Sequence, residues 1–279
     1  MSALYWILAL LGFFVVFWIV IFTVWWWRSR SEDKLDESIP TPGQYVMHPV
    51  FGHLVPDESG GLMTFRRFEF MRLFWKKAEQ NIADFGPYER ICIEKWEEYM
   101  LPLVRVHRRG GVWDVLRSKG VFEVNLDREK THTPTASQEA AYKLFLTNEE
   151  KICAHVTDAL LRYYQVARKD LSDWFDESFP ANPDIARLAE FVDFDGFTVC
   201  DCSANGISPM RWSWRPQWDE EHGMGMITFR DQVIMMDQDV DCFLESPAEF
   251  SKDSIWKREH MTNAEREALD EFIAGFKPK

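Results

Sequence analysis

The densest group of chemically active side chains runs from Trp218 to Gly223 (WDEEHG). It places the carboxylates of Asp219 and Glu221 beside the imidazole of His222. An imidazole titrates near neutral pH, and a hydrogen bond to a carboxylate fixes its tautomer. These residues can serve general acid–base catalysis, and Asp219 and His222 can bind a metal that takes a third ligand from elsewhere. The same residues suit a turn that opens a strand, with Trp218 in the core. Because no nucleophile accompanies them, we expect the turn, and we assign no catalytic residue and no metal site.

A second group is the pentapeptide RWSWR at residues 211–215. In a strand, alternation places its two tryptophans on one face and its two arginines on the other. One face then belongs to the core, and the alternative is an exposed patch with the composition favoured at protein interfaces. The residues that we expect to bind a partner are Trp212, Trp214, Arg211 and Arg215.

The five cysteines give no metal or disulfide pattern. Cys200 and Cys202 are two residues apart and can face the same side of a strand, but no second cysteine pair completes a zinc signature. We expect buried thiols and no cofactor. No P-loop, dinucleotide fingerprint, nucleophile elbow or HExxH motif occurs, which lowers the expectation of an enzyme.

An unbroken apolar run occupies residues 4–27 and is followed by Arg28 and Arg30. At about 1.5 Å per residue it would form a helix roughly 36 Å long, enough to cross a hydrocarbon core of about 30 Å. We therefore expect a transmembrane helix in the lipid bilayer. The basic residues after it predict an outward amino terminus and a cytoplasmic carboxyl-terminal domain. An odd, scattered cysteine set fits that reducing compartment.

The remainder of the chain is acidic and rich in apolar residues. The net charge is −13, and 46% of the residues are hydrophobic, which is enough to build a core. An acidic surface repels phosphates, so nucleic acid is not an expected ligand, whereas a protein partner is. The expected organisation is a transmembrane helix (4–27), a polar linker (28–43), a cytoplasmic α+β domain (44–241) and a carboxyl-terminal extension with a helix (242–279).

The sequence predicts an α+β fold in which a mostly antiparallel sheet packs with a helical pair. Thr135 and Gln138 form a capping box that opens the first helix, and Asn148 caps the second. Strands are predicted around residues 90–96, 101–107 and 120–126, and again at 197–202, 210–214, 225–229 and 233–236. Thr262 and Glu265 form a second capping box, which opens a last helix.

Three segments in order resemble an uncharacterised bacterial domain family. They are HPVFGHL at residues 48–54, the helical stretch 134–164, and WDEEHGMG at residues 218–225. Members of that family open with an HPxFG-L turn, carry a Pro-x-x-x-Gln helix start and end on WDxEHGxGV. Met226 stands where that pattern has valine. The resemblance implies a bacterial setting, and thus the bacterial inner membrane; some relatives look like immunity or accessory proteins near toxin genes.

Together these observations predict a membrane-anchored, non-enzymatic protein-binding domain. We expect it to act as an immunity or accessory protein in a toxin, defence or envelope system. The alternative is a hydrolase or metal-dependent enzyme centred on Asp219, Glu221 and His222.

Overall fold

The computed structural model describes residues 18, 46–56, 62–75, 82–97, 111–127, 133–219, 221–238, 240–250 and 254–277. The chain divides into two compact units, residues 1–41 and 42–279. All the strands and helices named below belong to the second unit. The predicted linker over residues 28–43 lies outside the described residues, and the predicted domain limits stay predictions.

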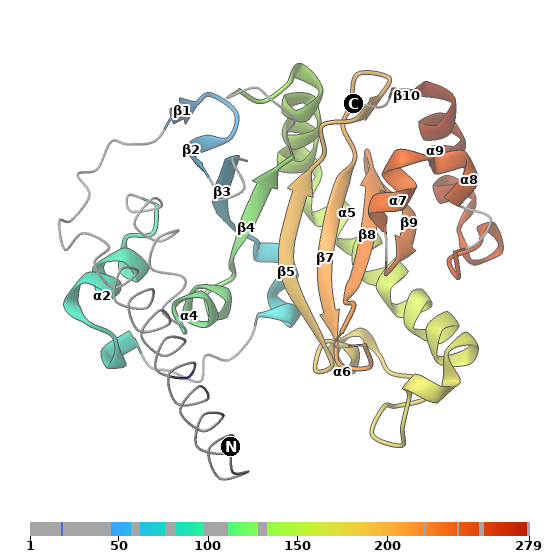
Figure 1. The fold of residues 1–279 in the computed structure, drawn as a ribbon, viewed down its shortest axis with the longest axis horizontal. Coiled ribbons are helices and arrows are strands. Elements are labelled where there is room, and N and C mark those ends of the chain that lie inside the picture. The colour runs from blue at the N-terminus through green and yellow to red at the C-terminus, as the bar shows by residue number, and fades with distance from the viewer. Residues whose placement is uncertain are drawn as a thin grey trace, which may run out of the picture. The chain divides into compact units, whose positions relative to one another are not determined.

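An eight-stranded sheet forms the centre of the second unit, in the order β1-β2-β3-β4-β5-β7-β8-β9 (Figure 1). Neighbouring strands are antiparallel except β4 and β5, which are parallel. A separate pair, β6 and β10, is antiparallel. The strands are β1 (Val46–His48), β2 (Gly52–Pro56), β3 (Leu62–Arg67), β4 (Val121–Leu126), β5 (Val192–Val199), β6 (Ser203–Ala204), β7 (Met210–Pro216), β8 (Met224–Phe229), β9 (Gln232–Asp237) and β10 (Phe276–Lys277).

The long helix α5 (Ala136–Asp170) follows β4, leads back to β5 and covers one face of the sheet (Figure 1). Its predicted capping box is confirmed, since the Thr135 hydroxyl accepts from the Gln138 N–H and the Gln138 side chain accepts from the Thr135 N–H. Asn148 has non-helical angles (φ −125°, ψ 24°) inside the helix. The predicted helical pair is therefore one helix with a kink at Asn148.

The main core lies between α5 and the sheet, and its centre is aromatic. Phe68 is fully buried between β3 and the short 3₁₀ helix η1 (Glu69–Phe74). Its ring centroid lies 5.4–6.5 Å from those of five other rings, and edge-to-face geometry is common among them. Such aromatic pairs add stability beyond the area they bury. The five rings belong to Phe122, Phe145, Phe194, Phe197 and Trp212.

The opposite face of the sheet is covered at its two ends. On one side α2 (Pro87–Glu94) and α4 (Val112–Ser118) enclose a smaller core with β2, β3 and β4. On the other side α7 (Val240–Glu245) packs so closely on β8 that a Cβ at Gly225 would lie 2.1 Å from the Val240 side chain. The remaining helices are η2 (Ile82–Asp84), η4 (Ser172–Trp174), α6 (Ile185–Leu188), α8 (Pro247–Phe250), η5 (Arg258–His260) and α9 (Asn263–Gly275).

The predicted fold class is wrong in two respects besides the membrane helix. The predicted mostly antiparallel sheet is a large mixed sheet, because α5 returns the chain to a strand parallel to β4. Residues 90–96, predicted as a strand, belong largely to helix α2. Pro87 stands in the first turn of that helix, where a missing N–H costs nothing. The predicted strand at 101–107 lies outside the described residues.

The membrane assignment is also corrected. Within the residues that the structure describes, no helix is both long enough and apolar enough to cross a bilayer. The segment 4–27, on which the prediction depended, lies outside those residues apart from Trp18. The transmembrane helix, the single-pass topology and the inner-membrane location are therefore withdrawn.

Candidate functional site

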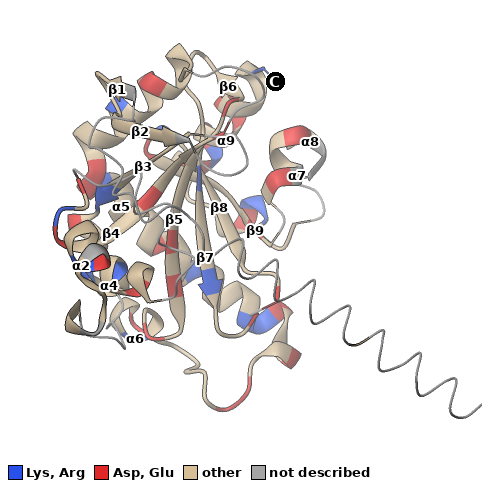
Figure 2. Ribbon diagram, turned by 60° about the vertical axis from the view of Figure 1, so that its left-hand side comes forward, with Lys and Arg blue, Asp and Glu red and all other residues tan. Residues whose placement is uncertain are grey.

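Between the two helical covers, the sheet face opposite α5 carries a row of polar side chains on β5 and β7. None of the described helices crosses these two strands on that face (Figure 1), and acidic segments of β5 lie beside basic segments of β7 (Figure 2). The strand register places Asp193 opposite Arg215 and Thr198 opposite Arg211. We call this row the central strip. Its members are Asp193, Asp195, Thr198, Arg211, Ser213 and Arg215.

The charges of the central strip are paired in a specific geometry. Arg215 binds Asp195 with two parallel hydrogen bonds, from Nε to Oδ2 at 2.7 Å and from Nη2 to Oδ1 at 2.6 Å. This fork raises the pKa of Arg215. Arg117 of α4 reaches the same carboxylate at 3.0 Å, and Arg211 pairs with Asp241 of α7. The strip therefore connects the two helical covers through ion pairs, and Arg215 remains about half exposed.

The alternation predicted for residues 211–215 is confirmed, but the tryptophans are not at the surface. Trp212 and Trp214 are 0% and 2% exposed and pack under α5 and η1 against Phe194. Trp212 also donates from Nε1 to the Thr228 hydroxyl at 2.9 Å. Of the four residues expected at the surface, the two arginines lie on the open face of β7. The two tryptophans lie in the core, because α5 covers the aromatic face of β7.

The turn between β7 and β8 brings Asp219 and His222 together. Asp219 Oδ1 lies 2.8 Å from His222 Nδ1, and Gln238 donates to Asp219 Oδ2 at 2.6 Å. The carboxylate is buried while the imidazole is exposed and stacks with Trp174, with ring centroids 6.4 Å apart. The hydrogen bond to Asp219 raises the pKa of His222. A carboxylate that fixes one ring nitrogen leaves the other free to exchange a proton.

The rest of this turn matches the structural interpretation of the sequence. Trp218 is buried among Tyr164, Phe175 and Phe179 and anchors the turn to the core. Gly223 has a φ of +71°, which favours glycine. Glu221 is exposed and adds to the negative charge near His222.

Residues 91–244, more than half of the chain, match the family described as a domain of unknown function, DUF6985. The chain belongs to this family. The matched part contains both the central strip and the Asp219–His222 pair, so both lie within the DUF6985 domain. No curated protein and no solved structure matches the chain.

The described cysteines of the DUF6985 domain are buried, free thiols. Burial raises the pKa of Cys153 to about 12, and it raises that of Cys200 well above the ordinary value. A thiol that stays protonated is a poor nucleophile and a poor metal ligand. Among the described residues, no three His, Cys, Asp or Glu side chains gather as a metal site would require.

Sequence reasoning missed several residues that complete these sites. Gln238, directly after β9, and Trp174 of η4 flank the Asp219–His222 pair, and no local motif connects them to it. Asp195 carried a usable signal, because the segment 192–197 (VDFDGF) alternates apolar and acidic residues as an exposed strand face does. The partly buried pair of Arg66 and Glu149 had no signal, since 83 residues separate its members.

Proposed function

We propose that the DUF6985 domain is a non-enzymatic module that binds another protein on the central strip. The observation that supports this most directly is a sheet face left open by the described helices and lined by ion-paired arginines and aspartates. Arginine is enriched at protein interfaces, and alternating charges of both signs fix the register of a partner. The net charge of −13 favours a partner with a basic surface.

The family resemblance adds a finer proposal about the partner. Some relatives look like immunity or accessory proteins near toxin genes, so we propose a toxin or a secretion-associated protein as the bound chain. An immunity protein acts by covering a surface of its toxin and needs no catalytic group of its own. The central strip supplies such a recognition surface without a nucleophile.

Site-specific photo-crosslinking in cells tests the location of the interface. A photoreactive amino acid replaces Arg215 on the strip or, as a matched control, Gln165 on the exposed side of α5. Arg117 still pairs with Asp195 after Arg215 is replaced, so the fold should persist. We expect one protein to crosslink from position 215 and none from position 165. An equal yield from both positions would contradict the proposed interface.

Charge substitution then tests the chemistry of the interface. We expect Arg215→Glu to weaken capture of the crosslinked partner by about tenfold or more, because it places a negative charge against the acidic group of the partner that faces Arg215. Arg187→Glu is the control, since Arg187 is exposed on α6 and pairs only with its neighbour Glu190 among the described residues. Equal changes in capture for both variants, in either direction, would contradict a specific role of the strip.

The Asp219–His222 pair supports a second candidate function, a hydrolase or metal-dependent enzyme that also uses Glu221. The favouring observation is an exposed imidazole oriented by a buried carboxylate. A screen of ester, amide and phosphoester hydrolysis, with and without divalent metals, separates the two functions. Turnover that His222→Ala abolishes and Glu190→Gln retains would favour the enzyme, whereas an inactive wild type favours the binding module.

A further inference from the structure

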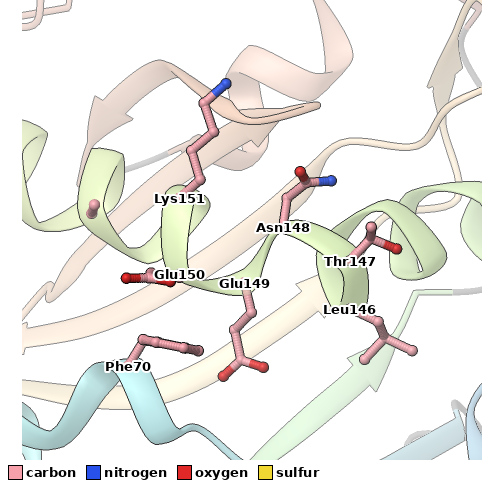
Figure 3. Close-up of a pocket in the computed structure, with 8 residues that line it drawn as sticks. Phe70, Leu146, Thr147, Asn148, Glu149, Glu150 and Lys151 are labelled. Carbon is pink, nitrogen blue, oxygen red and sulfur yellow. The ribbon is translucent and has the colours of Figure 1, made fainter.

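A pocket of about 540 Å³ opens beside the kink of α5, on the helix-covered side of the sheet (Figure 3). It lies where Asn148 leaves the helical conformation, and the Asn148 side-chain amide donates to the Leu144 carbonyl at 3.0 Å. Phe70 of η1, Leu146 and Glu149 surround it. Neither the central strip nor the Asp219–His222 pair contributes to its lining.

The floor of the pocket contains a carboxylate that is only half satisfied. The Glu149 side chain is 9% exposed, and its Oε2 accepts from Arg66 Nη2 at 2.5 Å. The other oxygen, Oε1, is buried and has no hydrogen-bond partner among the described residues. Leaving a buried charged acceptor without a donor is costly, so an unpaired carboxylate oxygen in a pocket calls for a ligand that donates.

The mouth of the pocket is apolar and acidic. Phe70 and Leu146 are 51% and 37% exposed, and Leu73, three residues from Phe70, is 53% exposed. Glu150 is exposed and forms no ion pair within the described part of the chain, and Figure 3 places its carboxylate near Phe70. Lys151 extends away from Phe70 and is neutralised by Asp231 at 2.5 Å. The unpaired charge at this mouth is therefore negative.

We propose that this pocket binds a lysine or arginine side chain presented by a polypeptide partner with a basic surface. The cationic head lies near Glu150 at the mouth, and Glu149 Oε1, which is buried in the structure, accepts from it when the Glu149 side chain turns toward the mouth. The aliphatic stem lies on Phe70 and Leu146, whose apolar surface suits the methylenes of such a side chain. A cation near the Phe70 ring also gains a cation–π contribution.

Two features select a polypeptide over a free small amine. The exposed apolar surface extends past the pocket lining to Leu73, which a single amine would leave uncovered. The net charge of −13 attracts a basic protein surface over its whole extent. This inference goes beyond the central strip, because it assigns a second contact surface on the side of the sheet that α5 covers.

Fluorine NMR of the full chain carrying 4-fluorophenylalanine at position 70 tests the proposal. The probes are N-acetyl-arginine methylamide, its neutral citrulline analogue, and the peptide acetyl-Ala-Leu-Arg-Leu-Ala-amide. We expect both arginine probes to shift the resonance and the citrulline probe to leave it unchanged. We also expect the peptide to bind about tenfold more tightly than the single residue, because its leucines cover Leu73 and Leu146.

Variants separate the pocket from general electrostatics. Glu150→Gln should weaken peptide binding by about threefold, measured by the same fluorine signal. Phe70→Ala should weaken it by about two- to fivefold, measured by calorimetry. Glu267→Gln on the exposed side of α9 removes the same charge as Glu150→Gln and is the control that should leave binding unchanged. Glu149→Gln should abolish binding. Because this substitution can also loosen the fold, the test is decided by Glu150→Gln and Phe70→Ala, which change exposed side chains.

Each remaining outcome decides against a stated part of the proposal. No shift with either arginine probe would overturn the cation site, even if the central strip binds a partner. If the single arginine residue and the peptide bind with equal affinity, the ligand of the pocket is a small free cation and not a polypeptide. A loss with Glu267→Gln as large as that with Glu150→Gln would mean that the probe binds by charge alone.

Discussion

The hydrogen bond between Asp219 and His222 makes the stability of the domain depend on pH. Asp219, first through this bond and then through its charge, raises the pKa of His222 above the unfolded value, and Glu221 adds to the effect. A raised histidine pKa stabilises the folded state fully below the unfolded pKa, and this contribution is lost as the pH rises through the folded pKa. We expect denaturant midpoints to fall from pH 6 to pH 9, beyond the change in a His222→Gln variant.

Asp219→Asn is the matched test of the cause, because an amide keeps the size of the side chain and removes its charge. We expect the His222 pKa, followed by the NMR shift of its ring protons, to move down in this variant. An unchanged titration would show that Asp219 does not control the imidazole.

Trp212 contributes to stability and not to a surface. It is fully buried, and its indole N–H donates to the Thr228 hydroxyl. Trp212→Phe removes that donor and leaves unfilled volume, so we expect a loss of about 1–3 kcal/mol in the free energy of unfolding. Trp174→Phe, at an exposed ring, should change it by less than about 0.5 kcal/mol. Urea denaturation measures both, and similar losses would contradict the burial of Trp212.

Gln138 does more than cap the start of α5. Its side chain accepts from Thr135 N–H at 2.9 Å and donates to the carbonyls of Asp127 and Val199 at 2.8 and 3.1 Å. These carbonyls lie where β4 and β5 end, so one buried amide joins the helix to the parallel strand pair. We expect Gln138→Ala to cost about 2–4 kcal/mol, since it removes three hydrogen bonds of one side chain, although the Val199 carbonyl keeps its bond from the Asp127 N–H at 3.0 Å.

The second capping box provides the comparison. Thr262→Ala at the start of α9 removes a cap without a link to the sheet, so we expect a loss of about 1 kcal/mol. Thermal unfolding of both variants gives the ratio. Equal losses would show that Gln138 acts only as a cap.

The parallel pair itself depends on Gly196. This residue sits at an irregularity of β5 with a φ of +132°, and a Cβ there would lie 2.4 Å from the Glu123 carbonyl oxygen of β4. An alanine must therefore push the two strands apart. We expect Gly196→Ala to cost more than about 2 kcal/mol, whereas Gly206→Ala, with open space around its Cβ, should cost less. Chemical denaturation compares them.

The elements that sequence reasoning found are those specified within a few residues. Both capping boxes join positions three residues apart, and the alternation at 211–215 has a period of two, so local sequence determines them. The apolar run in α2 is too short for its period to separate helix from strand. The parallel β4–β5 pair and the Arg66–Glu149 bond join residues far apart in the chain, and no local pattern encodes them.

The same limit applied to the candidate sites. The chemistry of residues 218–222 is contiguous and is visible in the sequence, but Gln238 comes from the segment directly after β9. Alternation separated the tryptophans of β7 from its arginines; which face α5 covers is decided by packing against Phe145 and Phe68. Alternation therefore predicts the two faces of β7 but not which of them lies at the surface.

The folded unit extends beyond the segment matched by the family. Residues 91–244 leave out Phe68, which contacts five aromatic rings of the core, and strands β2 and β3, which continue the sheet beyond β4. They also leave out α9, whose Phe272 packs on Phe229 and Phe243 and whose buried Glu265 pairs with Arg162 of α5 at 2.5 Å.

A fragment comprising residues 91–244 should therefore fail to form the native core, whereas residues 42–279 should unfold cooperatively. Losing Phe68 and Phe272 exposes apolar surface on both faces of the sheet, and each lost aromatic side chain costs about 3–5 kcal/mol, close to the whole stability of a domain. We expect the short fragment to bind a hydrophobic dye and to lack a sharp thermal transition. The longer fragment should bind no dye and should unfold in a sharp transition. A cooperative transition in the short fragment would mean that residues 91–244 fold without β2, β3 and α9.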